Sequence, residues 1–465
     1  MHTETPRIAT APALALIVAA TALIVIDTTI MGVAIPAIGT DLEVELVAAQ
    51  WTIVGYAVTF GAFILPTGSL SDRIGHRRLF TAGVSVFTVA SAGCAIASDI
   101  SILNVFRTVQ GAGAGMIFAT AVPLVVAITD DSARPRALAL WAAAAGAFSA
   151  VGPLLGGALI SLGDWWLIFA VNIPVGLAVL AATPRVLPPD RALRPATVTS
   201  GEVLAAAGIT AGLLGIFYLL DTARQEWTAG RVTLGAVALA IVAGTLATQG
   251  RSGAPLVDLT VLRNRCFSGA AALSMLSRFV TMAPPVFLVI YLQQQLSASP
   301  FAAGVVLVPM FIAAFTGGLV ARRVTGRYPV AWVVAGGFAL GALGAATTAA
   351  LIGPATSLPV IAAALIPAGF GFGISSTPLI AVAVSTVPAA RSGMASGLAN
   401  CFIPMGTAAG TALLGVVFTA TDRLETAAAA VLATAAGAGS IAAVLAVGTL
   451  RPSSPHANEK RRQAS

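Results

Sequence analysis

The chain has 465 residues, of which 57% are hydrophobic and 9% charged, and its mean hydropathy is +0.93. A soluble protein of this length would need far more polar residues on its surface, so the composition excludes a soluble globular protein. The net charge of +7 is spread along the chain instead of gathering on one face, which argues against nucleic-acid binding.

Fourteen apolar runs follow one another along the chain, and most are close to the ~20 residues that a membrane-spanning helix needs. The predicted spans are 12–35, 47–67, 79–98, 101–128, 138–160, 166–182, 202–221, 231–249, 267–292, 301–320, 329–352, 358–384, 394–420 and 427–450. This pattern predicts an all-α polytopic membrane protein. The first run has neither a cleavage site nor a short hydrophobic core, so we interpret it as a span and not as a signal peptide.

The basic residues lie mainly in loops that follow even-numbered runs and at the two ends of the chain. Loops after odd-numbered runs hold only Arg224, Arg231 and Arg423. Because cytoplasmic loops are enriched in Lys and Arg, we predict that both termini are cytoplasmic. The excess of arginine and alanine is typical of a GC-rich bacterial genome, so we expect a bacterial cytoplasmic membrane protein.

The polar stretches between runs divide the chain into four predicted parts. These are a six-helix bundle in 1–182, a linker with two extra spans in 183–265, a second six-helix bundle in 266–450, and a cytoplasmic tail in 451–465. A weak internal repeat supports this division, because the stretch from Gly317 matches the turn after the second run, with Ala321 in place of Asp72.

The first span, VIDTTIMGVAIP at 25–36, contains an acid, Asp27. A carboxylate inside a spanning helix costs about 2.5–3.5 kcal/mol on insertion scales unless it faces a cavity or takes up a proton. We therefore interpret Asp27 as a candidate for proton coupling and substrate binding, with Tyr56 of the second span as a further substrate-binding candidate. The alternative is that Asp27 only caps Thr28 or Thr29.

A short charged hinge, GSLSDRIGHRRLF at 68–80, connects the second and third spans. A loop this short requires the two flanking helices to lie antiparallel and close together. The acid in it can reach a helix N-terminus or a neighbouring arginine. The candidate gate residues are Gly68, Asp72, Arg73, Gly75 and Arg77.

The fourth and fifth spans carry further motifs. In LNVFRTVQGAGAG at 103–115, Arg107 and Gln110 lie one turn apart on the same helix face, and glycines follow that allow close packing. Gln110 is a further substrate-binding candidate. The alternative for Arg107 is that it only binds backbone carbonyls. The fifth span has glycines around a proline, which allow bending and tight packing; they are Gly152, Pro153, Gly156 and Gly157.

Arg278 lies about 15 Å into the ninth span, from ten residues at 1.5 Å each. This is too deep for its side chain to reach the membrane surface easily. We expect it to face a cavity and to pair with Asp27, with an anionic ligand, or with carbonyls freed by Pro284 and Pro285. Arg278 could therefore bind substrate or only stabilise the neighbouring backbone, and both interpretations stay open.

Together these motifs resemble the major facilitator superfamily of secondary transporters, in its fourteen-span drug:proton antiporter branch. The chain departs from that pattern at His76, Gly32 and Phe148. The resemblance implies two six-helix bundles plus two extra central helices, and a proton-coupled antiporter that exports amphiphilic drugs or antibiotics. It also implies proton coupling through Asp27 and Arg107, and the fifth-span motif is one found in antiporters.

Other functions stay open. A dedicated exporter of one endogenous metabolite or self-made antibiotic would have the same motifs. An uptake permease is disfavoured by the Gly152-Pro153 pair. A receptor that does not transport anything would not need charged residues buried in its spanning helices. We find no nucleotide-binding loop, catalytic triad or metal-ligand spacing, so we expect no enzyme activity, cofactor or metal. The expected partners are small amphiphilic substrates, protons and the lipid bilayer, for a protein that works as a monomer.

Overall fold

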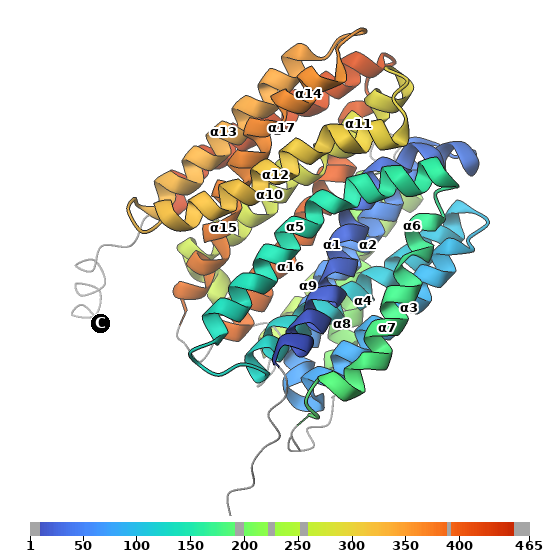
Figure 1. The fold of residues 1–465 in the computed structure, drawn as a ribbon. Coiled ribbons are helices and arrows are strands. Elements are labelled where there is room, and N and C mark those ends of the chain that lie inside the picture. Colours follow the sequence, from blue (N-terminus) through green and yellow to red (C-terminus); the bar gives the residue numbers. More distant parts are fainter. Residues whose placement is uncertain (1–9, 191–199, 222–227, 252–258, 388–391, 451–465) are drawn as a thin grey trace, which may run out of the picture.

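The computed structural model describes residues 10–190, 200–221, 228–251, 259–387 and 392–450. These residues form long helices that run roughly side by side, which confirms the all-α prediction (Figure 1). The helices are α1 (Thr10–Asp41), α2 (Leu46–Ile74), α3 (His76–Ala95), α4 (Ile100–Ala127), α5 (Arg134–Leu162), α6 (Leu167–Ala170), α7 (Asn172–Val186), α8 (Ser200–Asp221), α9 (Ala229–Arg251), η1 (Leu259–Arg263), α10 (Arg265–Met282), α11 (Pro284–Gln294), α12 (Pro300–Val324), α13 (Val330–Leu351), α14 (Leu358–Ala364), α15 (Ile366–Ser385), α16 (Ser392–Phe418) and α17 (Leu424–Thr449).

Within the described ranges, twelve helical segments are long and apolar enough to cross a membrane. Three of them are broken helices that act as one span each: α6 with α7, α10 with α11, and α14 with α15. All twelve coincide with predicted runs. The predicted count of fourteen is not supported, because the described apolar stretches of α8 and α9 cover only Ala207–Leu220 and Gly230–Thr245.

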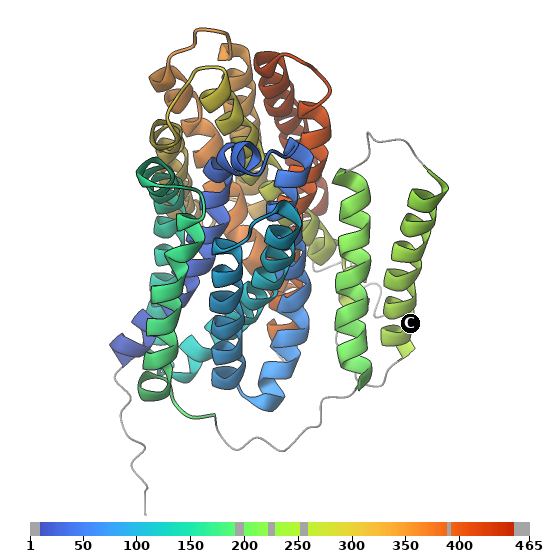
Figure 2. The same cartoon turned by 90° about the vertical axis from the view of Figure 1, so that its right-hand side faces the viewer.

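The helices form two halves with a hairpin beside them. Helices α1 to α7 make one half, and α10 to α17 make the other (Figure 1). The α8–α9 hairpin stands next to the bundle (Figure 2), and α8 packs against α2 of the first half and α16 of the second. The ring of Trp51 on α2 meets that of Tyr218 on α8 edge to face, with centroids 5.8 Å apart.

Buried apolar clusters join the halves at one end of the helices and also midway along them, where α2 packs against α16 around Val54 and Ala408. We call the end that holds the start of α1 and the end of α17 the terminal end, and the opposite one the far end. At the far end a single cluster spans both halves, from Ile35 of α1 to Phe287 of α11. At the terminal end each half has its own cluster, around Phe80 in the first and Phe267 in the second. The halves are therefore held together most firmly at the far end.

The hinge between α2 and α3 is shorter than predicted, because Gly75 alone separates the two helices. Its φ of +117° lies in a region that strains any residue with a side chain. Gly68, Asp72 and Arg73 belong to the last turns of α2 instead of a loop. Hydropathy predicts where a helix leaves the membrane, and α2 continues beyond that point into the polar region.

The carboxylate of Asp190, just after α7, caps the start of α3. It accepts hydrogen bonds from the backbone N–H groups of Arg77 at 2.9 Å and Arg78 at 3.1 Å. The guanidinium of Arg77 in turn donates to the carbonyl of Leu187 at 3.2 Å. A Cβ at Gly75 would collide with the same carboxylate. The segment that leaves the first half is thus attached to the hinge.

Candidate functional site

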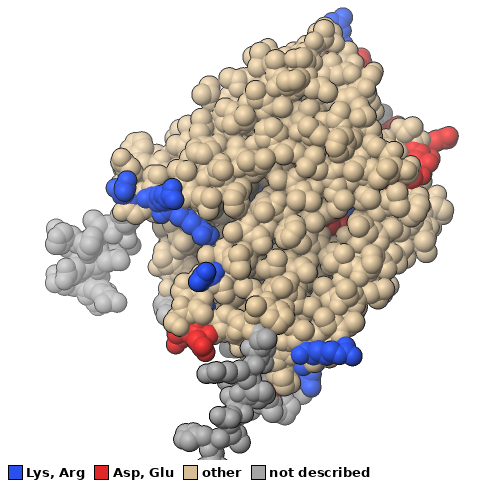
Figure 3. Space-filling view, viewed as in Figure 1, with Lys and Arg blue, Asp and Glu red and all other residues tan. Residues whose placement is uncertain are grey.

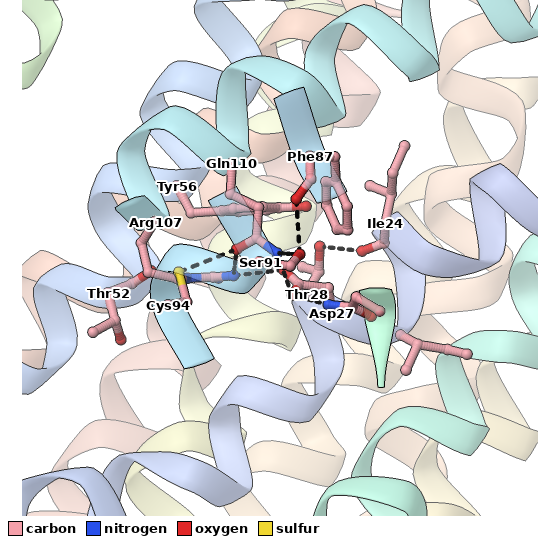
Figure 4. Close-up of polar contacts among 12 residues, drawn as sticks. Ile24, Asp27, Thr28, Thr52, Tyr56, Phe87, Ser91, Cys94, Arg107 and Gln110 are labelled. Carbon is pink, nitrogen blue, oxygen red and sulfur yellow. Dashed lines mark hydrogen bonds and ion pairs between the residues drawn. The ribbon is translucent and has the colours of Figure 1, made fainter. Parts of the chain in front are cut away.

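Asp27 lies on α1 with 1% of its surface exposed. Its carboxylate accepts hydrogen bonds from Arg107 Nη1 at 2.6 Å, Gln110 Nε2 at 3.1 Å and Asn172 Nδ2 at 3.2 Å (Figure 4). The residues predicted for proton coupling, Asp27 and Arg107, therefore form a direct ion pair. Arg278, one of the partners considered for Asp27, does not take part in it.

The rest of the network satisfies Arg107 and Gln110. Besides Asp27, Arg107 donates from Nη1 to Gln110 Oε1 at 2.6 Å and from Nε to the backbone carbonyl of Thr52 at 2.9 Å. The guanidinium carbon lies 4.2 Å from the ring centroid of Tyr56. Gln110 Nε2 also donates to Ser91 Oγ at 2.8 Å. Five helices of the first half, α1 to α4 and α7, thus contribute to one buried polar cluster.

The sequence of α4 brings these groups together. Arg107 and Gln110 are three positions apart, so their side chains leave the same face of the helix. Gly111 follows directly, and a Cβ there would collide with the backbone carbonyl of Tyr56. The missing side chain lets α4 approach α2 closely enough for Arg107 to reach the Thr52 carbonyl.

Sequence analysis missed two members of the cluster. Asn172 is the only amide in the sixth run, so a search for isolated polar residues within apolar runs would have found it. Ser91 gives no such signal, because hydroxyl side chains in a spanning helix commonly bond to their own backbone. Ser91 does this as well, donating from Oγ to the carbonyl of Phe87 at 2.8 Å.

The glycines of the fifth-span motif lie where α5 contacts two neighbours. The motif comprises Gly152, Pro153, Gly156 and Gly157. A Cβ at Gly152 would collide with Thr29 of α1, and one at Gly156 would collide with Ile30. A Cβ at Gly157 would lie 2.5 Å from the carbonyl oxygen of Pro300 on α12, in the other half. The motif therefore joins α1 to the interface between the halves.

Two polar side chains lie in the same interface toward the far end. Gln293 of α11 donates from Nε2 to the carbonyl of Val33 on α1 at 3.2 Å. Gln50 of α2 is fully buried against Gly415 of α16, and within the described part of the chain neither polar atom of its amide has a hydrogen-bond partner. One amide thus supports the contact between the halves, and the other weakens it.

Arg278 lies in the second half, on α10, and its side chain is half-buried. Its guanidinium carbon lies 5.0 Å from the ring centroid of Phe372 on α15. A small apolar pocket lies further along the same span, lined in part by Thr281, Pro284 and Met310. Among the described residues, no group of three or more His, Cys, Asp or Glu side chains could hold a metal ion.

Comparison with known proteins agrees with this architecture. A family model described as Major Facilitator Superfamily matches residues 17–265 and 267–465. The chain belongs to the major facilitator superfamily. It is therefore a membrane transporter of that superfamily and not an enzyme, and the general part of the sequence-based resemblance is confirmed.

Curated proteins are similar over most of this chain. The multidrug efflux pump LfrA of Mycolicibacterium smegmatis is 31% identical over 411 residues, covering 88% of this chain and 81% of that protein. The methylenomycin A resistance protein of Streptomyces coelicolor is 30% identical over 400 residues, covering 85% and 83%. A multidrug resistance protein B homolog of Mycobacterium tuberculosis is 32% identical over 434 residues, covering 90% and 79%.

Two solved transporter structures share the fold. A peptide transporter POT aligns with a TM-score of 0.69 at 17% identity, covering 94% of this chain and 93% of that one. A D-xylose-proton symporter aligns with a TM-score of 0.67 at 12% identity, covering 94% and 97%. At these identities the likeness shows the fold alone.

Proposed function

We propose that this transporter exports amphiphilic drugs or antibiotics across the cytoplasmic membrane in exchange for protons. The names of its relatives support drug export. The observation that carries the coupling is the buried Asp27–Arg107 pair. An acid at this depth is stable either with a proton or with a cationic partner. A proton and Arg107 therefore compete for the same carboxylate, which is the property that a coupling site needs.

Contacts of α1 and α5 support a route from this site to the interface between the halves. Protonation of Asp27 removes its ion pair with Arg107 and weakens the bond between α1 and α4. Thr29 lies two residues further along α1 and contacts Gly152 of α5. On α5, Gly157 contacts α12 of the other half. A shift of α1 on protonation would therefore move α5 at its contact with α12, where the two halves move relative to each other during transport.

We further propose that the terminal end is cytoplasmic and that the structure is inward-facing. Described arginines of the even-numbered loops, such as Arg77, Arg134 and Arg322, lie at helix ends on the terminal side, which suits a cytoplasmic location. Between charged ends, the face in Figure 3 is almost free of Lys, Arg, Asp and Glu, which suits a lipid-facing band. The apolar cluster shared by both halves closes the far end. One chain supplies both halves, so we propose a monomer as the working unit.

We propose that α8 and α9 also cross the membrane. They would form the two extra spans of the linker 183–265, between a first bundle in 1–182 and a second bundle in 266–450 that is followed by a cytoplasmic tail in 451–465. The two helices stand alongside the spanning helices (Figure 2). Large apolar side chains on α9 are exposed, including Val232, Val237 and Leu239. A lipid environment would cover this surface, whereas water would leave it unfavourably exposed.

The hinge is proposed to act as a conformational gate. Its residues are Gly68, Asp72, Arg73, Gly75 and Arg77. The Asp72 side chain is 75% exposed, and its carboxylate lies 3.8 Å from His76 Nε2. Such a weak contact leaves Asp72 available for a latch that forms only in the outward-facing conformation.

Substrate contact by Asp27, Gln110 and Tyr56 would also need another conformation. All three are buried inside the first half, with exposures of 1%, 0% and 2%.

A dedicated exporter of one antibiotic is the second candidate function, because some relatives are named for a single compound, methylenomycin A or tetracenomycin C. A panel of chemically unrelated substrates distinguishes it from a multidrug exporter.

Transport in proteoliposomes tests the proposal. The purified protein is reconstituted with a pH-sensitive dye inside, and ethidium or an antibiotic is added under an imposed pH gradient. We expect drug movement against proton movement, with both abolished by a protonophore. Drug transport that continues unchanged after the gradient has collapsed would contradict proton coupling.

A further inference from the structure

Arg278 is a cation held in the middle of the second half without an ionic partner. In the described part of the chain, its guanidinium has no hydrogen bond or ion pair, and the group it faces is the ring of Phe372, 5.0 Å away. The backbone next to it is fixed, because Gly406 of α16 packs directly against α10 and a Cβ there would lie 3.0 Å from Arg278 Cβ. The side chain is half-buried, so one side of it stays accessible.

The contrast with Arg107 shows what Arg278 lacks. Arg107 is almost completely buried, and it has a carboxylate, an amide oxygen and a backbone carbonyl as acceptors, whereas the half-buried Arg278 has none among the described residues. Asp27, one of the three partners considered for Arg278, is already paired with Arg107. The carbonyls near Pro284 are not bonded to Arg278 either. An unpaired cation inside a membrane-spanning segment is costly, so an anion from outside the described residues would stabilise Arg278.

We propose that Arg278 and Phe372 bind the anionic group of the transported compound, so that the preferred substrates are aromatic amphiphiles carrying a carboxylate or similar anion. The guanidinium offers a planar pair of donors that matches a carboxylate. The ring beside it offers a surface for an aromatic body. Arg278 itself lies among α10, α15 and α16, which contact one another in the second half. This inference rests on the proposed export function and names its substrate class.

Two rhodamine dyes test this inference with matched chemistry. Rhodamine B has a free carboxylate, and its ethyl ester differs only in masking that group. The Arg278→Gln variant removes the charge, and Arg278→Lys keeps it without the planar fork. Arg265→Gln is the control, because it removes an exposed arginine from the first position of the same helix. Binding to the purified protein is measured by fluorescence polarisation, and export is measured in proteoliposomes.

Wild type should bind rhodamine B more tightly than the ester. R278Q should lose about tenfold or more in affinity for rhodamine B, the value of a hydrogen bond to a charged group, with little change for the ester. R278K should fall between the two, and R265Q should match wild type. Thermal unfolding with each dye gives an independent readout, since only rhodamine B should stabilise R278K more than R278Q.

Other outcomes overturn the inference. Equal loss of both dyes in R278Q and R278K would mean that Arg278 only braces the helices, and no loss of either would mean that it does not contact substrate. Export of the ester without rhodamine B by wild type would overturn the anion site and leave the export function intact. Export of neither dye nor of any compound in the panel of unrelated substrates would overturn both.

Discussion

The Asp27–Arg107 ion pair gives the sharpest test of the site. Both side chains are almost completely buried, and their charged atoms lie 2.6 Å apart. Replacing Asp27 with Asn keeps the shape and one acceptor oxygen but leaves the Arg107 charge uncompensated. Removing one partner of a buried pair costs about 3–5 kcal/mol of stability. Because Gln110 and the Thr52 carbonyl still accept from Arg107, we expect D27N to lose about 3 kcal/mol, near the lower limit of that range.

Removing both charges should be less harmful than removing one. In D27N/R107Q, no charge is left buried, and two amides can bond to each other. We expect the double variant to recover about 0.5–3 kcal/mol relative to D27N, the range found for coupled neighbours. The surface pair of the exposed Asp131 and the partly buried Arg134, with its 2.8 Å contact, is the control. Its D131N/R134Q cycle should give a coupling energy of about 0.5 kcal/mol or less.

Unfolding and transport are measured on the same variants. Reversible unfolding in mixed micelles gives the free energies for the cycle. In proteoliposomes, D27N and D27N/R107Q should lose export driven by the pH gradient, because neither can exchange a proton at position 27. The reasoning is refuted by a double variant whose loss equals the sum of the single losses. Full gradient-driven export by D27N would separately exclude Asp27 as the coupling residue.

Three further substitutions test the gate and the interface between the halves. Asp72→Asn should slow turnover while substrate affinity stays near wild type, because its latch forms in only one state; reduced affinity with normal turnover would contradict this. Gly157→Leu should push α5 away from Pro300 and open the far end, which distance measurements between spin labels on the two halves would detect as a longer separation. Gln50→Leu should have the opposite effect, because it removes a buried amide whose missing hydrogen bonds cost about 1–3 kcal/mol of stability. The closed far end should therefore become more stable, and export should become slower. Unchanged label distances in both variants would show that these contacts do not set the conformation.

Much of the fold could be predicted from the sequence, because each helix that crosses a bilayer must be apolar along its whole length. A spanning helix needs about 20 apolar residues, so twelve segments could be placed by composition alone. The same demand makes a charged residue inside a run conspicuous, which singled out Asp27, Arg107 and Arg278. The three-residue spacing of Arg107 and Gln110 was likewise enough to predict that both side chains leave one face of their helix.

The tertiary structure decided which of these residues meet. Hydropathy cannot rank Arg107 above Arg278 as the partner of Asp27, because the choice depends on how each helix is rotated and which glycines let it approach its neighbours. The same limit hid Asn172, whose amide reaches Asp27 across 145 positions of sequence. It also hid Asp190, which caps α3 from beyond α7 and reduces the hinge to Gly75. Whether a segment enters the membrane depends on the hydrophobicity of its own residues, so it can be predicted from the sequence. Which polar side chains bond to each other depends on contacts between distant segments, so only the packed helices determine it.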